Sequence, residues 1–317
     1  MFLHAVSVTL RIRVLGAAAG GGFPQWNSNN EACRRARAGD PAARPASQAS
    51  LAVSADGERW ILLNASPDLR QQIEAAPNLH PRMGLRHSPI SAAVLTNGDV
   101  DAIAGLLTLR ERQSLAVYAT GRVLGILAAN PIFQVLAPDM VERRSLPVNE
   151  LTKVCDRDGR SLGLTVEAFP VPGKVPLYLE GLEKQLDTAH LGEETIGLRL
   201  SDGRGRGFYF IPSCARMTPQ LSDRLKDADL VFFDGTLWQD DEMIREGSGT
   251  KTGRRMGHMS VAGEDGTIAA FAGLGVRRKV FVHINNSNPL LLADSPERAE
   301  ALSQGWEVAF DGMEIAL

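Results

Sequence analysis

The sequence predicts an α/β fold in which sheets carry helices on their outer faces. Short β-type segments alternate with segments of helical periodicity along most of the chain. The first strand, Ser7–Gly16, shows the alternation of apolar and polar residues typical of a half-buried strand and stops at a glycine cluster. With 317 residues the chain is long enough to bury a large core without disulfides. Its three cysteines have no regular spacing, which fits a reducing compartment.

The first half of the chain continues this alternation. Leu51–Ser54 and Arg59–Asn64 flank the turn Asp56-Gly57 and predict a β-hairpin. Pro67–Ala76 is a predicted helix, because proline suits the first turn. The next predicted elements are the strand Ser91–Thr96, the helix Ile103–Leu109, the strand Leu115–Ala119, the helix Gly121–Ala129 and the strand Leu162–Phe169.

The second half contains two predicted loops between further elements. Val171–Glu194 is rich in proline, glycine and charge, which predicts a long loop or lid. Gly247–Gly257 combines glycines with basic residues and predicts a mobile loop. The predicted strands are Thr195–Leu200, Gly207–Ile211, Leu230–Asp234 and Arg278–Ile284, and the predicted helices are Pro219–Asp227, Val261–Leu274 and Ser295–Gln304.

Composition and charge exclude several classes of function. The formal net charge of −3 gives no general attraction for nucleic acid or for anionic membranes. No run of about 18 apolar residues and no cleavable signal segment is evident. We therefore expect a cytoplasmic protein that binds neither nucleic acid nor a membrane and that recognises its substrate locally.

Polar residues follow several of the predicted buried strands, where α/β proteins place their sites. Asp99 and Asp101 come after Ser91–Thr96, Asp234 ends the strand Leu230–Asp234, and His283 lies near the end of Arg278–Ile284. His258 stands in a glycine-flanked segment just before a predicted helix. Imidazole and carboxylate ligands together suit Zn²⁺ or Fe(II). A strand-end aspartate can equally be a helix N-cap or a turn residue, and a strand histidine can be a core residue.

The segment Thr96–Gly105 resembles the first metal-binding motif of the metallo-β-lactamase superfamily. In that superfamily a hydrophobic strand ends in T-H-x-H-x-D-H, followed by x-x-G. The frame matches, but Asn97, Asp99 and Ala102 stand at the three histidine positions, and Asp101 is the one metal ligand of the motif that is unchanged. The resemblance implies an αββα sandwich that forms one domain over residues 1–317, with a reduced set of metal ligands.

Downstream segments resemble the RNase Z and phosphodiesterase branch of this superfamily. Asp234–Trp238 is similar to its acidic E/D-x-T-F segment, and Gly257–Ser260 is similar to its G-H-S/M-T/S segment. His283 corresponds to the final metal-binding histidine. Ser213 occupies roughly the place of the expected bridging aspartate, and no histidine is present near Pro172–Lys174. A two-metal hydrolytic centre would therefore lack several ligands.

Within the superfamily, the chain is identified as a member of the coenzyme PQQ synthesis protein B family. Long strings that span nearly the whole chain carry this resemblance, which makes it more specific than a single metal motif. The strings are Arg13–Asn27, Ala65–Gln71, Gly105–Glu111, Phe169–Tyr178, Phe232–Trp238, Gly257–Ser260 and His283–Leu291.

The family resemblance implies a role in the biosynthesis of pyrroloquinoline quinone (PQQ). It implies non-haem iron-dependent hydroxylation of the tyrosine ring of a Glu–Tyr-derived precursor, with O₂ as co-substrate and other PQQ biosynthesis proteins as possible partners. One alternative is a soluble carrier of PQQ or its precursor towards the periplasm. A second alternative is a metal-dependent hydrolase.

The remaining ligands are sufficient for one metal ion. His258 and His283 with either Asp99 or Asp101 would give two imidazoles, one carboxylate and open positions, the ligand set of Fe(II) sites that activate O₂. Zinc could occupy the same site in purified protein. Asp234 could be a ligand or could orient His258, and we expect this pair to take part in catalysis.

Four basic residues are candidates for binding the carboxylates of a substrate. Lysine and arginine form strong charge-assisted hydrogen bonds with carboxylates. As loop cations they could instead serve only solubility. The four candidates are Arg70, Lys174, Lys251 and Arg254.

Overall fold

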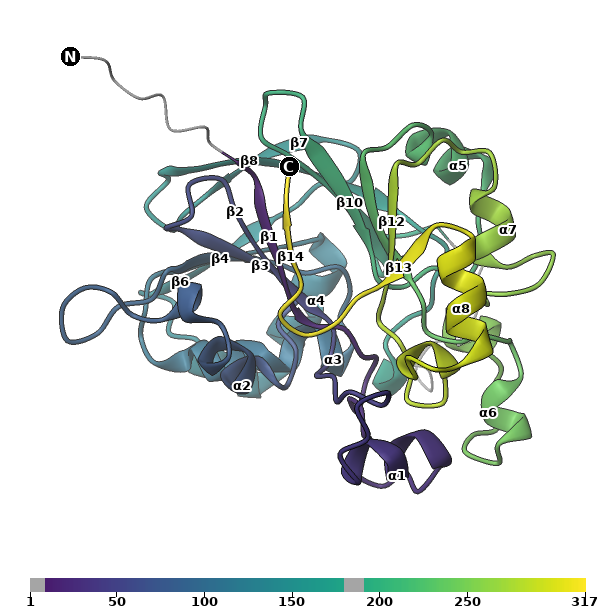
Figure 1. Cartoon of the computed structure of the whole chain (residues 1–317). Helices are drawn as coiled ribbons and strands as arrows, with labels where there is room; N and C mark the ends of the chain where they lie inside the picture. The colour runs from purple at the N-terminus through teal and green to yellow at the C-terminus, as the bar shows by residue number, and fades with distance from the viewer. Residues whose placement is uncertain (1–8, 180–190) are drawn as a thin grey trace, which may run out of the picture.

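The computed structural model describes residues 9–179 and 191–317, and their strands form two sheets that face each other (Figure 1). Each sheet has seven strands among the described residues. Helices cover the outer faces of both sheets, so the αββα sandwich predicted from the resemblance is confirmed. In the same residues no helix is long and apolar enough to cross a membrane.

The first sheet is built almost entirely from the first half of the chain. Its order is β14-β1-β2-β3-β4-β5-β6, antiparallel up to the predicted hairpin β2–β3 and parallel from β3 to β6. Its strands are β1 (Arg11–Gly16), β2 (Ser50–Ser54), β3 (Trp60–Leu63), β4 (Ile90–Val94), β5 (Leu115–Ala119), β6 (Val141–Ser145) and β14 (Glu314–Ala316).

The second sheet has the order β13-β12-β11-β10-β9-β8-β7. Strands β10 to β13 run parallel, whereas β7, β8 and β9 pair antiparallel with their neighbours. Its strands are β7 (Leu151–Cys155), β8 (Ser161–Pro170), β9 (Ile196–Ser201), β10 (Gly207–Ile211), β11 (Leu230–Asp234), β12 (Arg278–Val282) and β13 (Trp306–Val308).

Two outer layers of helices and one central core hold the sandwich together. The α-helices are α1 (Glu31–Arg37), α2 (Leu69–Glu74), α3 (Val100–Ile103), α4 (Gly121–Ala129), α5 (Pro219–Leu225), α6 (Glu242–Arg245), α7 (Thr267–Phe271) and α8 (Pro296–Ser303). The 3₁₀-helices are η1 (Pro77–Leu79), η2 (Ala104–Arg110), η3 (Pro131–Val135), η4 (Leu177–Leu179), η5 (Arg254–Met256) and η6 (Pro289–Leu291). Apolar residues of α2, α3 and α4 pack on the first sheet, and those of α5, α7 and α8 pack on the second.

The central core lies between the two sheets. Leu51 and Ile61 of the first sheet are fully buried in the same cluster as Leu198, Phe210 and Phe232 of the second. Burying a side chain of this size stabilises the folded state by roughly 1.5–3 kcal/mol. This core fixes the two sheets relative to each other, and therefore fixes the loops at their edges.

The structure differs from the sequence predictions mainly where polar residues form strands or glycines stop helices. The strands β6 and β7 were not predicted, because their mixed polar sequences lack alternation. The predicted helix Val261–Leu274 is reduced to α7, since Val261 instead donates its N–H to the carbonyl of Leu237 (2.9 Å). Gly263, with a φ of +94°, also interrupts the helix.

The described residues of both predicted loops flank one edge of the sandwich. Residues 171–179 of the predicted lid include η4, whereas residues 180–190 lie outside the described part of the chain. The predicted loop Gly247–Gly257 contains the short η5 and ends at Gly257, whose φ of +87° suits glycine. A Cβ atom at Gly257 would lie 3.1 Å from the Cγ atom of Lys174, so the two loops are in close contact.

Candidate metal centre

Strand ends from both sheets converge at this edge. Asp234 is the last residue of β11, and His283 follows β12, its parallel neighbour in the sheet. Isolated bridges pair Asn97 with Thr195 and Ala18 with Ile284, which ties the first sheet to the second at the same place. The structure thus brings residues that follow strands of both sheets to one place.

Asp234 is completely buried, and its carboxylate is saturated with hydrogen-bond donors. One oxygen, Oδ2, accepts from the backbone N–H of Cys214 (2.9 Å) and lies 2.7 Å from Nδ1 of His258. The other, Oδ1, accepts from the backbone N–H (3.0 Å) and the hydroxyl (2.6 Å) of Thr236. A carboxylate with four donors holds its neighbours in place and has little capacity left for a metal.

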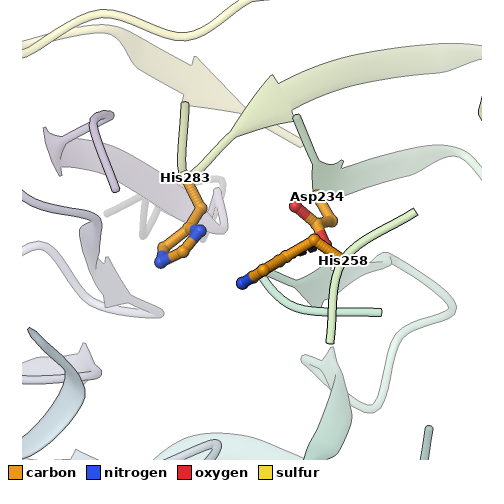
Figure 2. Close-up of side chains that lie close together, drawn as sticks. All are labelled: Asp234, His258 and His283. Atoms are coloured by element: carbon orange, nitrogen blue, oxygen red, sulfur yellow. Dashed lines mark hydrogen bonds and ion pairs between the residues drawn. The ribbon is translucent and has the colours of Figure 1, made fainter. Parts of the chain in front are cut away.

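Figure 2 shows the tips of the His258 and His283 rings pointing to the same side, with Asp234 beside the opposite end of the His258 ring. Their rings stack with a centroid distance of 5.1 Å and an interplanar angle of 20°. The Nδ1 atom of His258 contacts Asp234, and the Nδ1 atom of His283 lies 2.8 Å from the hydroxyl of Thr236. Each ring therefore has its Nε2 atom directed away from these partners. Among the described residues, His258 Nε2 has no hydrogen-bond partner.

Asp101 contacts His283 from the opposite sheet. Its Oδ2 atom lies 2.8 Å from His283 Nε2. Burial by itself would raise the pKa of Asp101, but the hydrogen bond and charge of His283 hold this pKa below its ordinary value. Burial by itself would lower the pKa of His283, but the hydrogen bond to Asp101 and its negative charge raise this pKa above its ordinary value. A nitrogen and an oxygen this close can act as neighbouring ligands of one metal ion.

Asp99 precedes α3, but its side chain makes no capping hydrogen bond to that helix. Its Oδ1 atom instead lies 3.7 Å from Nζ of Lys174, and its backbone N–H donates to Oδ1 of Asn97 (2.9 Å). The N-cap alternative for Asp99 is therefore not supported. The contact with Lys174 also distinguishes Asp99 from Asp101, whose carboxylate faces His283.

A cavity of about 570 Å³ opens in front of the two histidines. Lys174 and Lys251, two of the four proposed substrate-binding cations, line it together with Asp99 and Asp101. Tyr178 also lines it and donates its hydroxyl to the carbonyl of Gly98 (2.7 Å). This bond ties the segment after β8 to the turn that carries both aspartates.

The structure places the other two proposed cations outside this cavity, which corrects the sequence analysis for both. Arg70 is exposed on α2. Arg254 forms an ion pair with Asp265 (3.1 Å) beside a separate surface cleft. Arg70 and Arg254 lie near family motifs in the sequence, but this nearness did not predict whether their side chains reach the cavity. Sequence analysis missed Tyr178 and assigned no role to Thr236, although both lie in the strings that carried the family resemblance.

A second, much smaller void of about 10 Å³ lies behind the site. Asn97, Ala102 and Ser213 line it together with Asp101 and His283. The first three stand at positions where the superfamily motifs have metal ligands that this chain lacks. A void of this size holds about one water molecule. The residues around it offer an amide, a methyl group and a hydroxyl, which are poor zinc ligands. This side of the site does not fit a second metal.

Comparisons with known proteins agree with this architecture. The family model described as Beta-lactamase superfamily domain matches residues 59–284. The protein named Coenzyme PQQ synthesis protein B from Gluconacetobacter diazotrophicus is 62% identical over 302 residues, which cover 95% of this chain and 98% of that protein. The chain belongs to the coenzyme PQQ synthesis protein B family. The relative of the same name from Xanthomonas euvesicatoria pv. vesicatoria is 55% identical, over 97% of this chain and all of that protein.

Solved structures place the chain in the same family. The crystal structure of Zn²⁺-bound PqqB from Methylobacterium extorquens is 51% identical, superimposes with a TM-score of 0.92, and covers 97% of this chain and 100% of that one. A diphosphatase from the PhnP family, at 19% identity and a TM-score of 0.68, covers 98% of this chain and 97% of that one, and shares the fold alone. The two comparisons confirm the metallo-β-lactamase fold, and the first concerns a relative that binds zinc.

Proposed function

We propose that the protein acts in PQQ biosynthesis as a single-metal, Fe(II)-dependent oxygenase that hydroxylates the tyrosine ring of a Glu–Tyr-derived precursor. Its membership of a family of PQQ synthesis proteins supports the pathway. The observation that carries the chemistry is the arrangement of two imidazoles and one carboxylate around the large cavity, with the second metal position closed.

The proposed ligands are His258, His283 and Asp101. Both imidazoles direct Nε2 away from the groups that hold Nδ1, and Asp101 lies within 2.8 Å of one of them. Asp234 lies close to both histidines: ligand atoms of the three residues come within 4.8 Å of one another. We assign it an orienting role nevertheless, because its oxygens already accept from four donors.

Iron bound to such a set would supply O₂ activation, because two imidazoles and one carboxylate leave coordination positions open. The chain itself would hold the substrate. Lys174 and Lys251 line the cavity and are suited to bind the precursor's carboxylates, and Tyr178 and Met256 provide apolar surface for its ring.

A carrier remains the second candidate, since the same cavity and lysines could hold the anionic product PQQ without chemistry. Hydrolysis is the least supported candidate. Two-metal hydrolysis needs metals about 3.5–4 Å apart. The void beside Asn97, Ala102 and Ser213 lacks both space and ligands for the second one.

Oxygen consumption separates the three candidates. The purified protein would be stripped of metal and loaded without oxygen with Fe(II) or with Zn²⁺, and each form would then receive a Glu–Tyr-derived amino acid. The oxygenase is expected to consume O₂ only with iron, because Zn²⁺ has no redox chemistry. Hydrolysis with zinc and no oxygen uptake with iron would refute the oxygenase. Tight binding of PQQ by metal-free protein, with neither activity, would support the carrier.

A further inference from the structure

The hydroxyl of Thr236 lies at the centre of the polar groups around the metal centre. The side chain is buried in the loop that follows β11. Its Oγ1 atom lies 2.6 Å from Asp234 Oδ1, 2.8 Å from His283 Nδ1, 2.9 Å from the carbonyl of His283 and 3.0 Å from His258 Nδ1. One small side chain thus contacts both histidines and the buried carboxylate.

The donors and acceptors around this hydroxyl restrict how it can bond. A hydroxyl has one proton to donate and two lone pairs to accept with. The shortest contact is with the Asp234 carboxylate, the strongest acceptor present, so the proton goes there. The Nδ1–H of His258 is closer to Asp234 Oδ2 (2.7 Å) than to Thr236 (3.0 Å). The lone pairs of Thr236 are therefore left to accept from His283 Nδ1.

We infer that Thr236 is a positioning residue that fixes the tautomer and the direction of the His283 ring. With Nδ1 protonated and bonded to Thr236, the ring of His283 directs Nε2 toward Asp101 and the cavity. Without a metal Nε2 donates its N–H to Asp101, and a metal ion bound to Nε2 would take the place of that proton. Asp234 then orients both imidazoles, His258 directly and His283 through the threonine hydroxyl. The inference rests on the proposed role of His283 as a metal ligand.

The backbone at His283 also lies next to the Thr236 hydroxyl. His283 has a φ of +61°, a conformation that non-glycine residues adopt at a cost. The Thr236 hydroxyl lies against the carbonyl of the same residue as well as its ring. Removal of the hydroxyl should therefore affect His283 more than His258, which keeps its bond to Asp234.

The test compares two variants. Thr236→Val keeps the shape of the side chain and removes its hydroxyl, whereas Thr236→Ser keeps the hydroxyl. Thr267→Val is the matched control, since Thr267 is also buried but donates to the carbonyl of Ser260 (3.2 Å). Two readouts are used: zinc affinity in competition with a chelator, and ¹⁵N NMR of the imidazole nitrogens in metal-free and zinc-loaded protein.

We expect Thr236→Val to weaken zinc binding about 10–100-fold, the usual effect of removing a group that orients a metal-binding histidine. In metal-free Thr236→Val the NMR signals of His283 should lose the protonated Nδ1 pattern, because Nδ1–H has lost its acceptor, whereas those of His258 should keep it. Thr236→Ser should retain affinity within about threefold, and Thr267→Val should match wild type. Wild-type affinity and an unchanged His283 tautomer in Thr236→Val would overturn the inference, as would equal effects on both histidines. Neither readout uses iron or oxygen, so failure of the oxygenase proposal would be seen separately.

Discussion

The two sheets supply the metal centre with side chains held in different ways. On the side of the second sheet, Asp234 is fully buried, bonded to two backbone N–H groups and in contact with His258. On the side of the first sheet, Asp101 and Asp99 line the cavity, and their contacts are with His283 and Lys174. The second sheet therefore provides a rigid support, and the first sheet provides carboxylates that remain available for a metal or a substrate.

The largest expected effect is the loss of metal binding in His283→Ala. His283 is the residue that both sheets contact, through Thr236 and Asp101. We expect zinc affinity to fall more than about 100-fold, because a two-imidazole site would lose one of its two nitrogen ligands. Equilibrium dialysis with metal analysis measures this. His80→Ala is the control, since His80 contacts the carbonyls of Ile73 and Glu74 outside the site.

The same dialysis counts the metal ions. We expect at most one tightly bound metal per chain, because the void at Asn97, Ala102 and Ser213 lacks ligands. If two metal ions per chain remained after exhaustive dialysis, the conclusion that the void at Asn97, Ala102 and Ser213 cannot hold a second metal would be wrong.

The next effect distinguishes the two aspartates by stability. In Asp234→Asn the new amide NH₂ would face buried donors, so we expect the free energy of unfolding to fall by about 2–4 kcal/mol. Asp101→Asn at about pH 8 should cost less than about 1 kcal/mol, because Asp101 faces the cavity and accepts its backbone hydrogen bond from its own N–H, whereas Asp234 accepts one from the distant Cys214. Urea denaturation of the metal-free variants measures both. Equal losses of unfolding free energy in the two variants would contradict the assignment of Asp234 as a supporting residue and Asp101 as a metal ligand.

Asp101→Asn should nevertheless abolish iron-dependent oxygen consumption, if Asp101 is the carboxylate ligand. Asp99→Asn is the companion variant, and we expect it to retain iron binding because Asp99 contacts Lys174. Retention of activity in Asp101→Asn and its loss in Asp99→Asn would reverse the assignment.

A smaller effect concerns the two lysines of the cavity. We expect Lys174→Met or Lys251→Met to weaken PQQ binding about tenfold, the loss of one charge-assisted contact. Arg70→Met and Arg254→Met are matched controls, because both arginines lie outside the cavity lining. Fluorescence titration with PQQ measures the affinity. Equal weakening by the control variants would show that the effect is one of overall charge.

The smallest effect is the pH dependence of metal-free protein. The raised pKa of His283 contributes stability below the ordinary value of 6.5, and this contribution is lost as pH rises through the raised pKa. The lowered pKa of Asp101 contributes stability above 3.8, and this contribution is lost as pH falls through the lowered pKa. Wild type should therefore exceed Asp101→Asn most near pH 5.5, by on the order of 1 kcal/mol, and least near pH 9. Thermal unfolding at several pH values measures this, and a difference that grows toward pH 9 would contradict it.

The sequence by itself determined the fold class, most strands and the identity of the polar residues at the strand ends. Buried strands such as β4, β11 and β12 are readable because their apolar residues are contiguous and are followed by polar residues or turns. His283 and Asp101 were chosen as candidates in this way, and His258 from its glycine-flanked segment, with the family resemblance supplying the frame.

Only the tertiary structure decided what each polar side chain faces. The sequence left Asp99 and Asp101 equivalent, and packing separates them by directing one toward Lys174 and the other toward His283. It left Asp234 as ligand or support, and two of the donors to its carboxylate, the backbone N–H of Cys214 and Nδ1 of His258, come from segments that only the fold brings to it. The sequence offered four basic residues as equal candidates for substrate binding, and the fold places two of them, Lys174 and Lys251, in the cavity lining. Side-chain direction depends on contacts between residues far apart in the chain, and local pattern does not encode these contacts.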